Sequence, residues 1–206
     1  VTPPGIPAFT TINSIEPLPT NPDGLYLAAT GYRQDDFTPY LFATDDLGKS
    51  WRRIDTGIDR QHFTRVIRAD PVRAGLLYAG TERGVYVSFD DGAQWQPLQQ
   101  NLPVTPVTDL AVKGNDLLAA TQGRAFWVLD NLDHIRQVNP GWAKQSVVLP
   151  RPEAAVQLAG RRGRNADEPS LTTGMNPRGD GQVWFHLGEQ YADAEVEVEF
   201  LRNGEV

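Results

Sequence analysis

Apolar and polar residues alternate in short runs along most of the first 138 residues. The clearest run is residues 85–89, in which Val85, Val87 and Phe89 alternate with Tyr86 and Ser88. Runs of four to seven residues with this period, bounded by turn residues, are typical of β-strands. No segment shows the wider apolar spacing of a long amphipathic helix. The pattern therefore predicts an all-β chain.

The predicted strands recur in sets. Each set begins with an alternating segment, continues through a Gly-, Asn- or Asp-containing turn, and enters a second apolar segment. The paired segments are residues 12–15 and 25–30, 64–69 and 77–81, and 108–112 and 117–121. Four short strands every ~40–45 residues are the pattern of a β-propeller blade. We expect residues 1–145 to form three four-stranded antiparallel blades. They would belong to a larger propeller, because a closed ring needs at least about four blades.

A Ser/Thr-x-Asp-x-Gly-x-x-Trp motif follows the third predicted strand of the first two sets. Its residues are Thr44, Asp46, Gly48 and Trp51, then Ser88, Asp90, Gly92 and Trp95. A further 40 residues lead from Asp90 to Asp130, where residues 128–132 are interpreted as a decayed third copy. The Asp accepts backbone hydrogen bonds in a tight turn, the Gly adopts a positive φ, and the Trp packs between sheets. The motif is therefore predicted to be structural.

This motif resembles the Asp-box, or BNR repeat, of sialidases, two-propeller xyloglucanases and sortilin-like (Vps10) propellers. Residues 102–117 and 121–130 are also similar to the propeller end of large bacterial proteins described as BNR-repeat glycosyl hydrolases, with departures at Gln122 and Ala125. The resemblance implies that the Asp-box carboxylates lie on the rim opposite a catalytic face. It also implies a secreted, periplasmic or cell-surface location.

The composition shifts after Trp142, which predicts a second region. Residues 146–176 are expected to form a linker, in which 161–164 is a basic cluster. Alternation over 182–187 and 194–201 predicts strands, and 202–205 predicts a hairpin turn. By resemblance to the same bacterial proteins, residues 177–206 are the first strands of a β-sandwich. We expect the chain to be an internal piece of a longer protein.

Composition and charge exclude several function classes. The 206 residues include no cysteine and have a formal net charge of −7. Disulfides and thiolate metal sites are therefore absent, and no basic footprint for nucleic acid or anionic lipid is present. No run approaches the ~18 apolar residues of a membrane span. The three histidines, His62, His134 and His186, are too widely separated to suggest a metal site, and no cofactor is predicted.

Candidate binding residues lie in the loops between second and third strands. Arg33, Arg83 and Arg124 occupy comparable positions in the three sets. They either bind a carboxylate or phosphate together or brace adjacent blades. Tyr32 belongs to a longer loop, residues 32–40, that mixes aromatic and charged side chains as sugar-binding loops do.

Asp35 or Asp36 with Asp59 is the candidate acid/base pair of a glycosidase, which requires carboxyl groups either ~5 or ~6.5–9.5 Å apart. The sequence shows no Tyr–Glu nucleophile of the sialidase kind.

Three hypotheses follow from these observations. The first is a secreted or cell-envelope ligand-binding or protein-interaction scaffold of the sortilin-like kind, with a glycan or peptide ligand. The alternative is part of a glycoside hydrolase acting on extracellular polysaccharide. The third is a structural module inside a larger assembly. In each case the remaining propeller blades of the parent protein are expected partners, and the sequence leaves open whether the protein is an enzyme.

Overall fold

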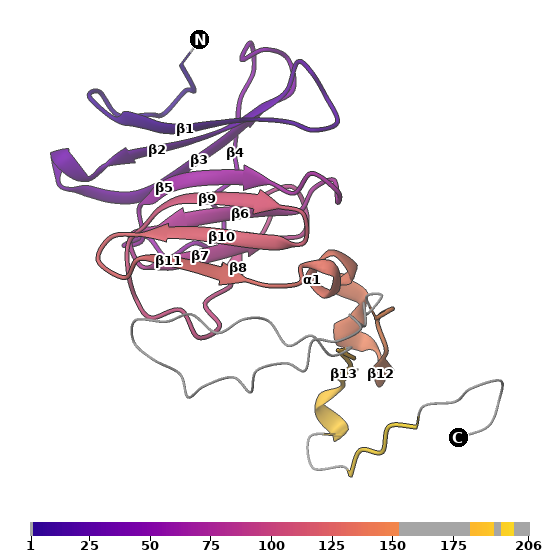
Figure 1. The fold of residues 1–206 in the computed structure, drawn as a ribbon. Helices are drawn as coiled ribbons and strands as arrows, with labels where there is room; N and C mark the ends of the chain where they lie inside the picture. The colour runs from indigo at the N-terminus through magenta and orange to yellow at the C-terminus, as the bar shows by residue number, and fades with distance from the viewer. Residues whose placement is uncertain (1, 153–181, 192–194, 200–206) are drawn as a thin grey trace. The chain divides into compact units, whose positions relative to one another are not determined.

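The computed structural model describes residues 2–152, 182–191 and 195–199 (Figure 1). The chain divides into two compact units, Val1–Arg136 and Gln137–Val206, which are described separately. The first unit contains three antiparallel sheets of the propeller-blade type, and within each sheet neighbouring strands are consecutive in sequence. The predicted all-β fold class is confirmed.

The first two sheets have four strands each. The first contains β1 (Thr11–Pro17), β2 (Leu25–Gly31), β3 (Asp36–Thr44) and β4 (Arg52–Arg53). The second contains β5 (Thr64–Ala69), β6 (Leu77–Thr81), β7 (Gly84–Ser88) and β8 (Gln96–Pro97). These bounds agree with the predicted strands. The second strand of each sheet is buried almost throughout, because both of its faces are covered by side chains of neighbouring elements.

The third sheet differs from the other two. In the described part of the chain it has three strands, β9 (Val107–Lys113), β10 (Asp116–Thr121) and β11 (Phe126–Leu129), in the order β11-β10-β9. The short helix α1 (Asp133–Gln137) follows β11 where a fourth strand was predicted. The prediction of a third four-stranded blade is therefore wrong in this respect.

The pairing register also corrects the position of the third motif copy. Thr44 pairs with Leu25 and Ser88 with Leu77, whereas the residue paired with the equivalent Leu117 is Leu129. Counting from Leu129, Asn131 rather than Asp130 takes the place of the motif Asp, and Arg136 takes the place of the Trp.

The substituted residues explain why α1 forms. Leu129 has no hydroxyl to hold the turn, and the Asn131 side chain instead accepts a hydrogen bond from the backbone N–H of Asp133, at 3.2 Å. An Asn in this position favours the start of a helix. Leu132 and Ile135, three residues apart, are then buried on one side of the helical turn.

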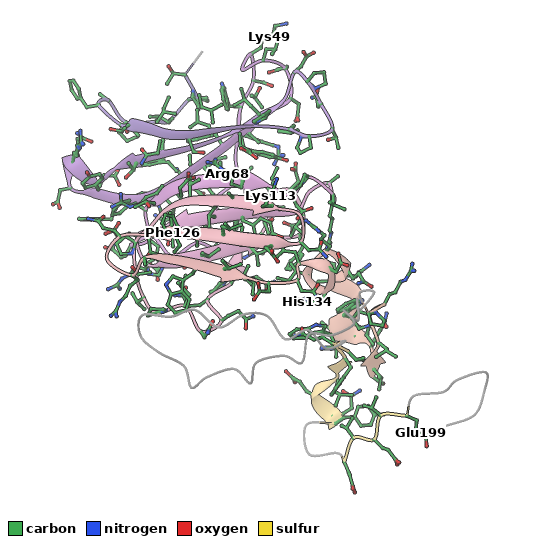
Figure 2. The ribbon with its side chains drawn as sticks, viewed as in Figure 1. Lys49, Arg68, Lys113, Phe126, His134 and Glu199 are labelled. Carbon is green, nitrogen blue, oxygen red and sulfur yellow. The ribbon has the colours of Figure 1, made fainter. Side chains whose placement is uncertain are left out.

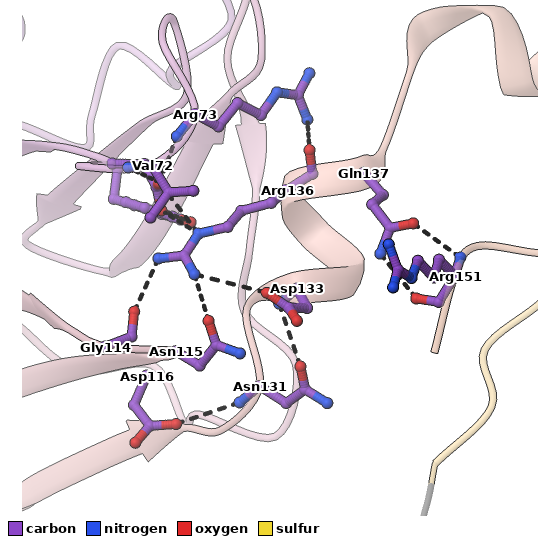
Figure 3. A network of polar contacts seen from close by, with 12 residues as sticks. Val72, Arg73, Gly114, Asn115, Asp116, Asn131, Asp133, Arg136, Gln137 and Arg151 are labelled. Carbon is purple, nitrogen blue, oxygen red and sulfur yellow. Dashed lines mark hydrogen bonds and ion pairs between the residues drawn. The ribbon is translucent and has the colours of Figure 1, made fainter. Parts of the chain in front are cut away.

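Arg136 anchors α1 to the second sheet (Figure 3). Its Nε donates to both carboxylate oxygens of Asp70, at 3.1 and 3.0 Å. Its guanidinium also donates to Asn115 Oδ1 and to the Gly114 carbonyl. Asp70 is fully buried and Arg136 almost so. A buried carboxylate is tolerated only when it is paired in this way. The ion pair between Arg136 and Asp70 therefore stabilises the helical conformation of residues 133–136.

The core of this unit lies between the sheets. One cluster joins the first and second sheets and includes Leu41, Ile67 and Trp95. A second cluster joins the second and third sheets and includes Tyr78 and Leu110. Burying each large apolar side chain contributes about 1.5–3 kcal/mol. Stacking sheets face to face is thus the main source of stability.

The second unit has little regular structure among its described residues. It contains η2 (Pro140–Lys144), β12 (Val147–Val148), β13 (His186–Leu187) and η3 (Glu189–Tyr191), and β12 pairs antiparallel with β13. β12 therefore lies inside the predicted linker, and residues 195–199 are not in a strand. The basic cluster 161–164 and the turn 202–205 lie outside the described residues, so the linker and sandwich remain predictions. Among the described helices, none has the length and apolar character needed to cross a membrane.

Candidate functional site

The connections between strands lie at the two opposite ends of the strands. One end carries the Asp-box turns, and we call it the motif edge. The other end carries the turns from second to third strand and the passages from one sheet to the next, and we call it the loop edge. In Figure 2, Lys113 at the end of β9 and Phe126 at the start of β11 mark the motif edge and the loop edge of the third sheet. The predicted ligand-binding residues all belong to the loop edge.

Both Asp-boxes have the same internal geometry. The Thr44 hydroxyl donates to Asp46 at 2.8 Å and accepts from the Gly48 N–H at 2.9 Å. In the second box Ser88 makes the equivalent contacts with Asp90 and Gly92, at the same two distances.

The two motif glycines have φ values of 77° and 82°, a conformation that favours Gly. In the described part of the chain, the carboxylates of Asp46 and Asp90 accept hydrogen bonds only from residues of their own turns, as the structural prediction requires. The neighbouring Asp91 instead accepts from Tyr26 and Arg52 of the first sheet.

The pKa of Asp46 reflects this turn. Hydrogen bonds from the Ser50 side chain, then from its backbone N–H and from Thr44, lower the pKa of Asp46 to about 2. Such a carboxylate stays ionised and acts as an acceptor. This environment fits a turn-holding group and does not suit a general acid.

The two motif tryptophans have different surroundings. Trp95 is buried between the first and second sheets, and its indole N–H donates to the Ile54 carbonyl of the first sheet. Trp51 packs beside Tyr40 and Phe42 on the opposite face of the first sheet. Its indole N–H is buried without a hydrogen-bond partner in the part of the chain that the structure describes.

Aromatic side chains from two sheets meet at the loop edge. Tyr32, in the helical turn η1 (Tyr32–Gln34), stacks on Phe63 with ring centroids 5.2 Å apart and an interplanar angle of 12°. Phe37 contacts the same ring at 6.0 Å. Phe63 is buried, whereas Tyr32 and Phe37 are each 39% exposed. The buried ring therefore supports two rings that face solvent.

Two arginines flank these rings. The Arg65 guanidinium lies over Phe63 and Tyr32, 5.1 and 5.8 Å from the centroids, and is held by Glu82 through hydrogen bonds of 2.8 and 2.6 Å. Arg33 donates to the Tyr32 hydroxyl at 3.4 Å. This hydrogen bond, with the Arg33 charge, lowers the pKa of Tyr32. We call Tyr32, Arg33, Phe37, Phe63 and Arg65 the loop-edge cluster.

The three arginines predicted to act together are not brought together by any interaction within the described residues. Arg33 contacts Tyr32, whereas Arg83 is exposed and its backbone N–H donates to Thr81 Oγ1 at 3.2 Å. Arg124 is also exposed, and its carbonyl accepts from the Trp127 indole at 2.9 Å. A shared anion site formed by all three stays a prediction.

The candidate catalytic carboxylates have unequal surroundings. Asp36 accepts from the Tyr40 hydroxyl at 2.6 Å and from the Thr38 N–H at 3.0 Å. Burial raises the pKa of Asp36, but these hydrogen bonds outweigh burial and lower it. Asp35 is exposed and adopts a left-handed conformation at the end of η1. Asp59 accepts from the Gln61 N–H at 2.8 Å. Asp36 is thus engaged by its own strand, and the acid/base pairing stays a prediction.

A histidine lies beside the candidate Asp59. His62 Nδ1 is 2.8 Å from the Tyr86 hydroxyl, and the two rings meet edge to face. Burial lowers the pKa of His62, and the nearby Asp59 partly opposes this effect. The sequence predicts an ordinary structural or surface residue at this position, and the ring of His62 contacts the core residue Tyr86. Within the described ranges, no group of three or more His, Cys, Asp or Glu side chains is placed to hold a metal ion.

Sequence reasoning missed Phe63 and Arg65. Phe63 and Arg65 flank the start of β5, where they read as ordinary alternating strand residues. The only signal in the sequence was the position of Phe63 at the end of the passage from the first to the second sheet. This passage lies at the loop edge, as Tyr32 does.

Comparisons with known proteins give limited matches. No family model matches the chain, and no curated protein matches it. Among solved structures, the GH74 enzyme of Niastella koreensis is 14% identical with a TM-score of 0.46, covering 58% of this chain and 21% of that one. The GH74 xyloglucanase of Xanthomonas campestris is 15% identical with a TM-score of 0.44, covering 68% and 25%.

YCF48 bound to D1 peptide is 19% identical with a TM-score of 0.43, covering 59% of this chain and 36% of that one. The chain thus spans between about a fifth and about a third of the length of these proteins. At these scores the assignment of blades rests on the sheets of the structure itself, and no activity is transferred.

Proposed function

We propose that this chain is part of a ligand-binding or protein-interaction scaffold of the sortilin-like Asp-box kind, located outside the cytoplasm as a secreted, periplasmic or cell-surface protein. The observation that supports binding is the loop-edge cluster. It presents two half-exposed aromatic rings over a buried ring, next to two guanidinium groups.

The chemistry of the cluster suits a glycan or a peptide. An aromatic face provides apolar contact for a sugar ring or an apolar side chain. Arginine beside it adds a planar donor for a carboxylate or hydroxyl. Because Glu82 fixes Arg65, this side chain loses little conformational freedom on binding. The cluster is therefore partly preorganised as a contact surface.

The proposed partners include the remaining propeller blades of the parent protein. Two observations support this. Among the described residues, the buried Trp51 indole N–H has no acceptor of the kind that Ile54 provides for Trp95. On the opposite side of the unit, Phe126 of β11 is 81% exposed and Val128 is 50% exposed, although the equivalent Val85 and Val87 of β7 are buried. Further blades on both sides would cover these groups.

The alternative, a glycoside hydrolase using Asp35 or Asp36 with Asp59, is less well supported. Both Asp36 oxygens are engaged by Tyr40 and Thr38. An alanine variant at each of the three carboxylates, assayed in the parent protein on extracellular polysaccharides, tests this alternative directly. A loss of turnover in these variants would favour the enzyme over the scaffold.

A binding screen with matched variants tests the proposed site. The chain is applied to an array of oligosaccharides from extracellular polysaccharides and to a peptide array. Hits are then titrated with Tyr32→Ala, Phe37→Ala and the control Val72→Ala, an exposed apolar residue in the β5–β6 turn at the motif edge. We expect both loop-edge variants to weaken binding by ~10-fold or more, with no change in the control. If every hit binds Tyr32→Ala and Phe37→Ala as well as the unaltered chain, the proposed site is wrong.

A further inference from the structure

A cavity lies between the second and third sheets. It encloses ≈ 400 Å³, counting the part that is open to solvent. Its walls come from β10 and β11 of the third sheet and from Val85 and the segment that follows β8 in the second. The cavity belongs to the first compact unit and is formed by residues outside the loop-edge cluster.

The cavity occupies the place that Trp95 fills one repeat earlier. Trp95 belongs to a core cluster that includes Leu41, Ile54, Ile58, Leu77, Ala79 and Tyr86. The strand registers and the motif spacing give each of these six residues an equivalent in the next repeat. Taken in the same order, the equivalents are Val85, Leu98, Leu102, Leu117, Ala119 and Trp127. All six line the cavity. The walls of the Trp95 site are thus repeated, whereas the tryptophan is not.

The chain's own next segment does not supply the missing side chain. Arg136 stands at the position equivalent to Trp95, and its guanidinium is committed to the buried Asp70 (Figure 3). Arg73 adds hydrogen bonds to the carbonyls of Ile135 and Arg136, each at 3.1 Å. Residues 133–136 are therefore held in α1 and do not enter the cavity.

The edge of β11 is open beside the cavity. In each of the first two sheets, the residue that follows the fourth strand donates a hydrogen bond to the third strand. In the first sheet the Ile54 N–H donates to the Leu41 carbonyl at 2.9 Å, and in the second the Leu98 N–H donates to the Val85 carbonyl at 2.8 Å. The equivalent carbonyl on β11 is that of Phe126. Within the described residues no strand pairs with this side of β11. An edge with unpaired backbone groups is a template for strand addition.

We infer that the third sheet accepts an extended segment of a partner protein as its fourth strand, and that this segment inserts a tryptophan into the cavity. The partner strand pairs antiparallel with β11, and the residue three positions after its tryptophan donates to the Phe126 carbonyl. Its indole N–H meets the Leu98 carbonyl, which is equivalent to the Ile54 carbonyl that Trp95 uses. The site is independent of the loop-edge cluster, so the two are tested separately.

The experiment uses a probe taken from the chain itself. A fluorescein-labelled, capped peptide with the sequence of residues 92–99 carries the fourth strand of the second sheet with Trp95. Fluorescence anisotropy with the full 206-residue chain is expected to show saturable binding. The same peptide with alanine at the tryptophan position is expected to bind at least ~10-fold more weakly, because large buried aromatic side chains dominate such interfaces.

Two variants of the chain block different parts of the site. Val128→Pro removes an N–H on the open edge of β11, and Ala119→Ile fills the cavity. Each is expected to weaken peptide binding by ~10-fold or more, while Val104→Ser, at an exposed position outside the cavity wall, leaves it unchanged. Near-ultraviolet circular dichroism establishes that each variant is folded. Equal binding of the tryptophan and alanine peptides overturns the inference. It is equally overturned if folded Val128→Pro and Ala119→Ile both bind as tightly as the unaltered chain.

Discussion

The second and third sheets share a strand layout and a pairing register but differ in one motif. Both pair a leucine of the second strand with the residue that begins the motif, Leu77 with Ser88 and Leu117 with Leu129. In the second sheet the motif runs through Asp90 and Gly92 to Trp95, and a fourth strand follows. In the third sheet Arg136 replaces the tryptophan and lies within the helix α1. Among the described residues, the two sheets that carry the complete motif have a fourth strand and the sheet that lacks it does not, although all three share the first three strands.

The largest expected effect comes from removing the tryptophan that distinguishes the second sheet. Trp95→Ala leaves a cavity between the first and second sheets and removes the hydrogen bond to Ile54. It should lower the free energy of unfolding by about 4 kcal/mol. Trp51→Ala should cost less than half as much, because Trp51 is only partly buried and its indole N–H has no acceptor in the described chain. Urea denaturation of both variants measures the two free energies of unfolding. Equal losses in Trp95→Ala and Trp51→Ala would contradict the expected difference between the two tryptophans.

The next effect tests what replaces the tryptophan in the third sheet. Arg136→Ala leaves Asp70 buried without its cation, which should lower the free energy of unfolding by about 3 kcal/mol. Arg83→Ala, at an exposed arginine whose side chain has no such contact, is the control and should change it by less than about 0.5 kcal/mol. Replacing Asp70 by Asn in the Arg136→Ala background should recover part of the loss. If the single and double variants unfold alike, Asp70 is not the group that Arg136 stabilises.

A smaller effect is expected from the hydroxyl that the third sheet lacks. Ser88 is buried and its hydroxyl serves both Asp90 and the Gly92 N–H. Ser88→Ala should lower the free energy of unfolding by about 1–2 kcal/mol, since it leaves a buried N–H without its acceptor. Thr108→Ala, at an exposed hydroxyl of the third sheet, should have little effect. Thermal unfolding monitored by circular dichroism compares the two variants, and a Ser88→Ala midpoint equal to that of Thr108→Ala would argue against a role for the hydroxyl.

The smallest expected effect concerns pH. The pKa of Asp46 is lowered from 3.8 to about 2, principally by its hydrogen bonds to Ser50. Because the folded-state pKa is below the unfolded one, the ionised form contributes stability above pH ~4, and this contribution is lost as the pH falls towards ~2. Asp46→Asn removes this dependence, as Asn131 does naturally in the third sheet. Urea midpoints between pH ~2 and ~5 should fall less steeply in the variant, and parallel curves would show that Asp46 does not contribute.

Much of the fold was predictable from local pattern. Alternation and the two motif copies located the strands of the first two sheets, because the residues that hold each Asp-box turn lie within eight positions of one another. The third copy was placed one residue too early, at Asp130, because a carboxylate at about the right spacing outweighed the loss of the Ser/Thr at Leu129. Only the pairing of Leu129 with Leu117 reveals the shift.

The candidate site was predictable only in part. Tyr32 was identified from the composition of its loop, and Arg33 from the recurrence of an arginine in three comparable loops. Phe63 and Arg65 were not, because they contribute through contacts with a residue about thirty positions away. The cavity was also not foreseen, since it depends on which side chain is missing from a set of equivalent walls. A single sequence reveals the repeat more readily than the exceptions to it.

The central claim is that the cavity between the second and third sheets is an unfilled copy of the Trp95 site. Titrating free indole into ¹⁵N-labelled chain and recording amide shifts tests this most directly. We predict saturable shifts concentrated at Leu102, Leu117 and Ala119, which line the cavity, with none at Leu77 and Ala79, where Trp95 already occupies the site. Absence of shifts at the cavity, or equal shifts at both sets of residues, would contradict the claim.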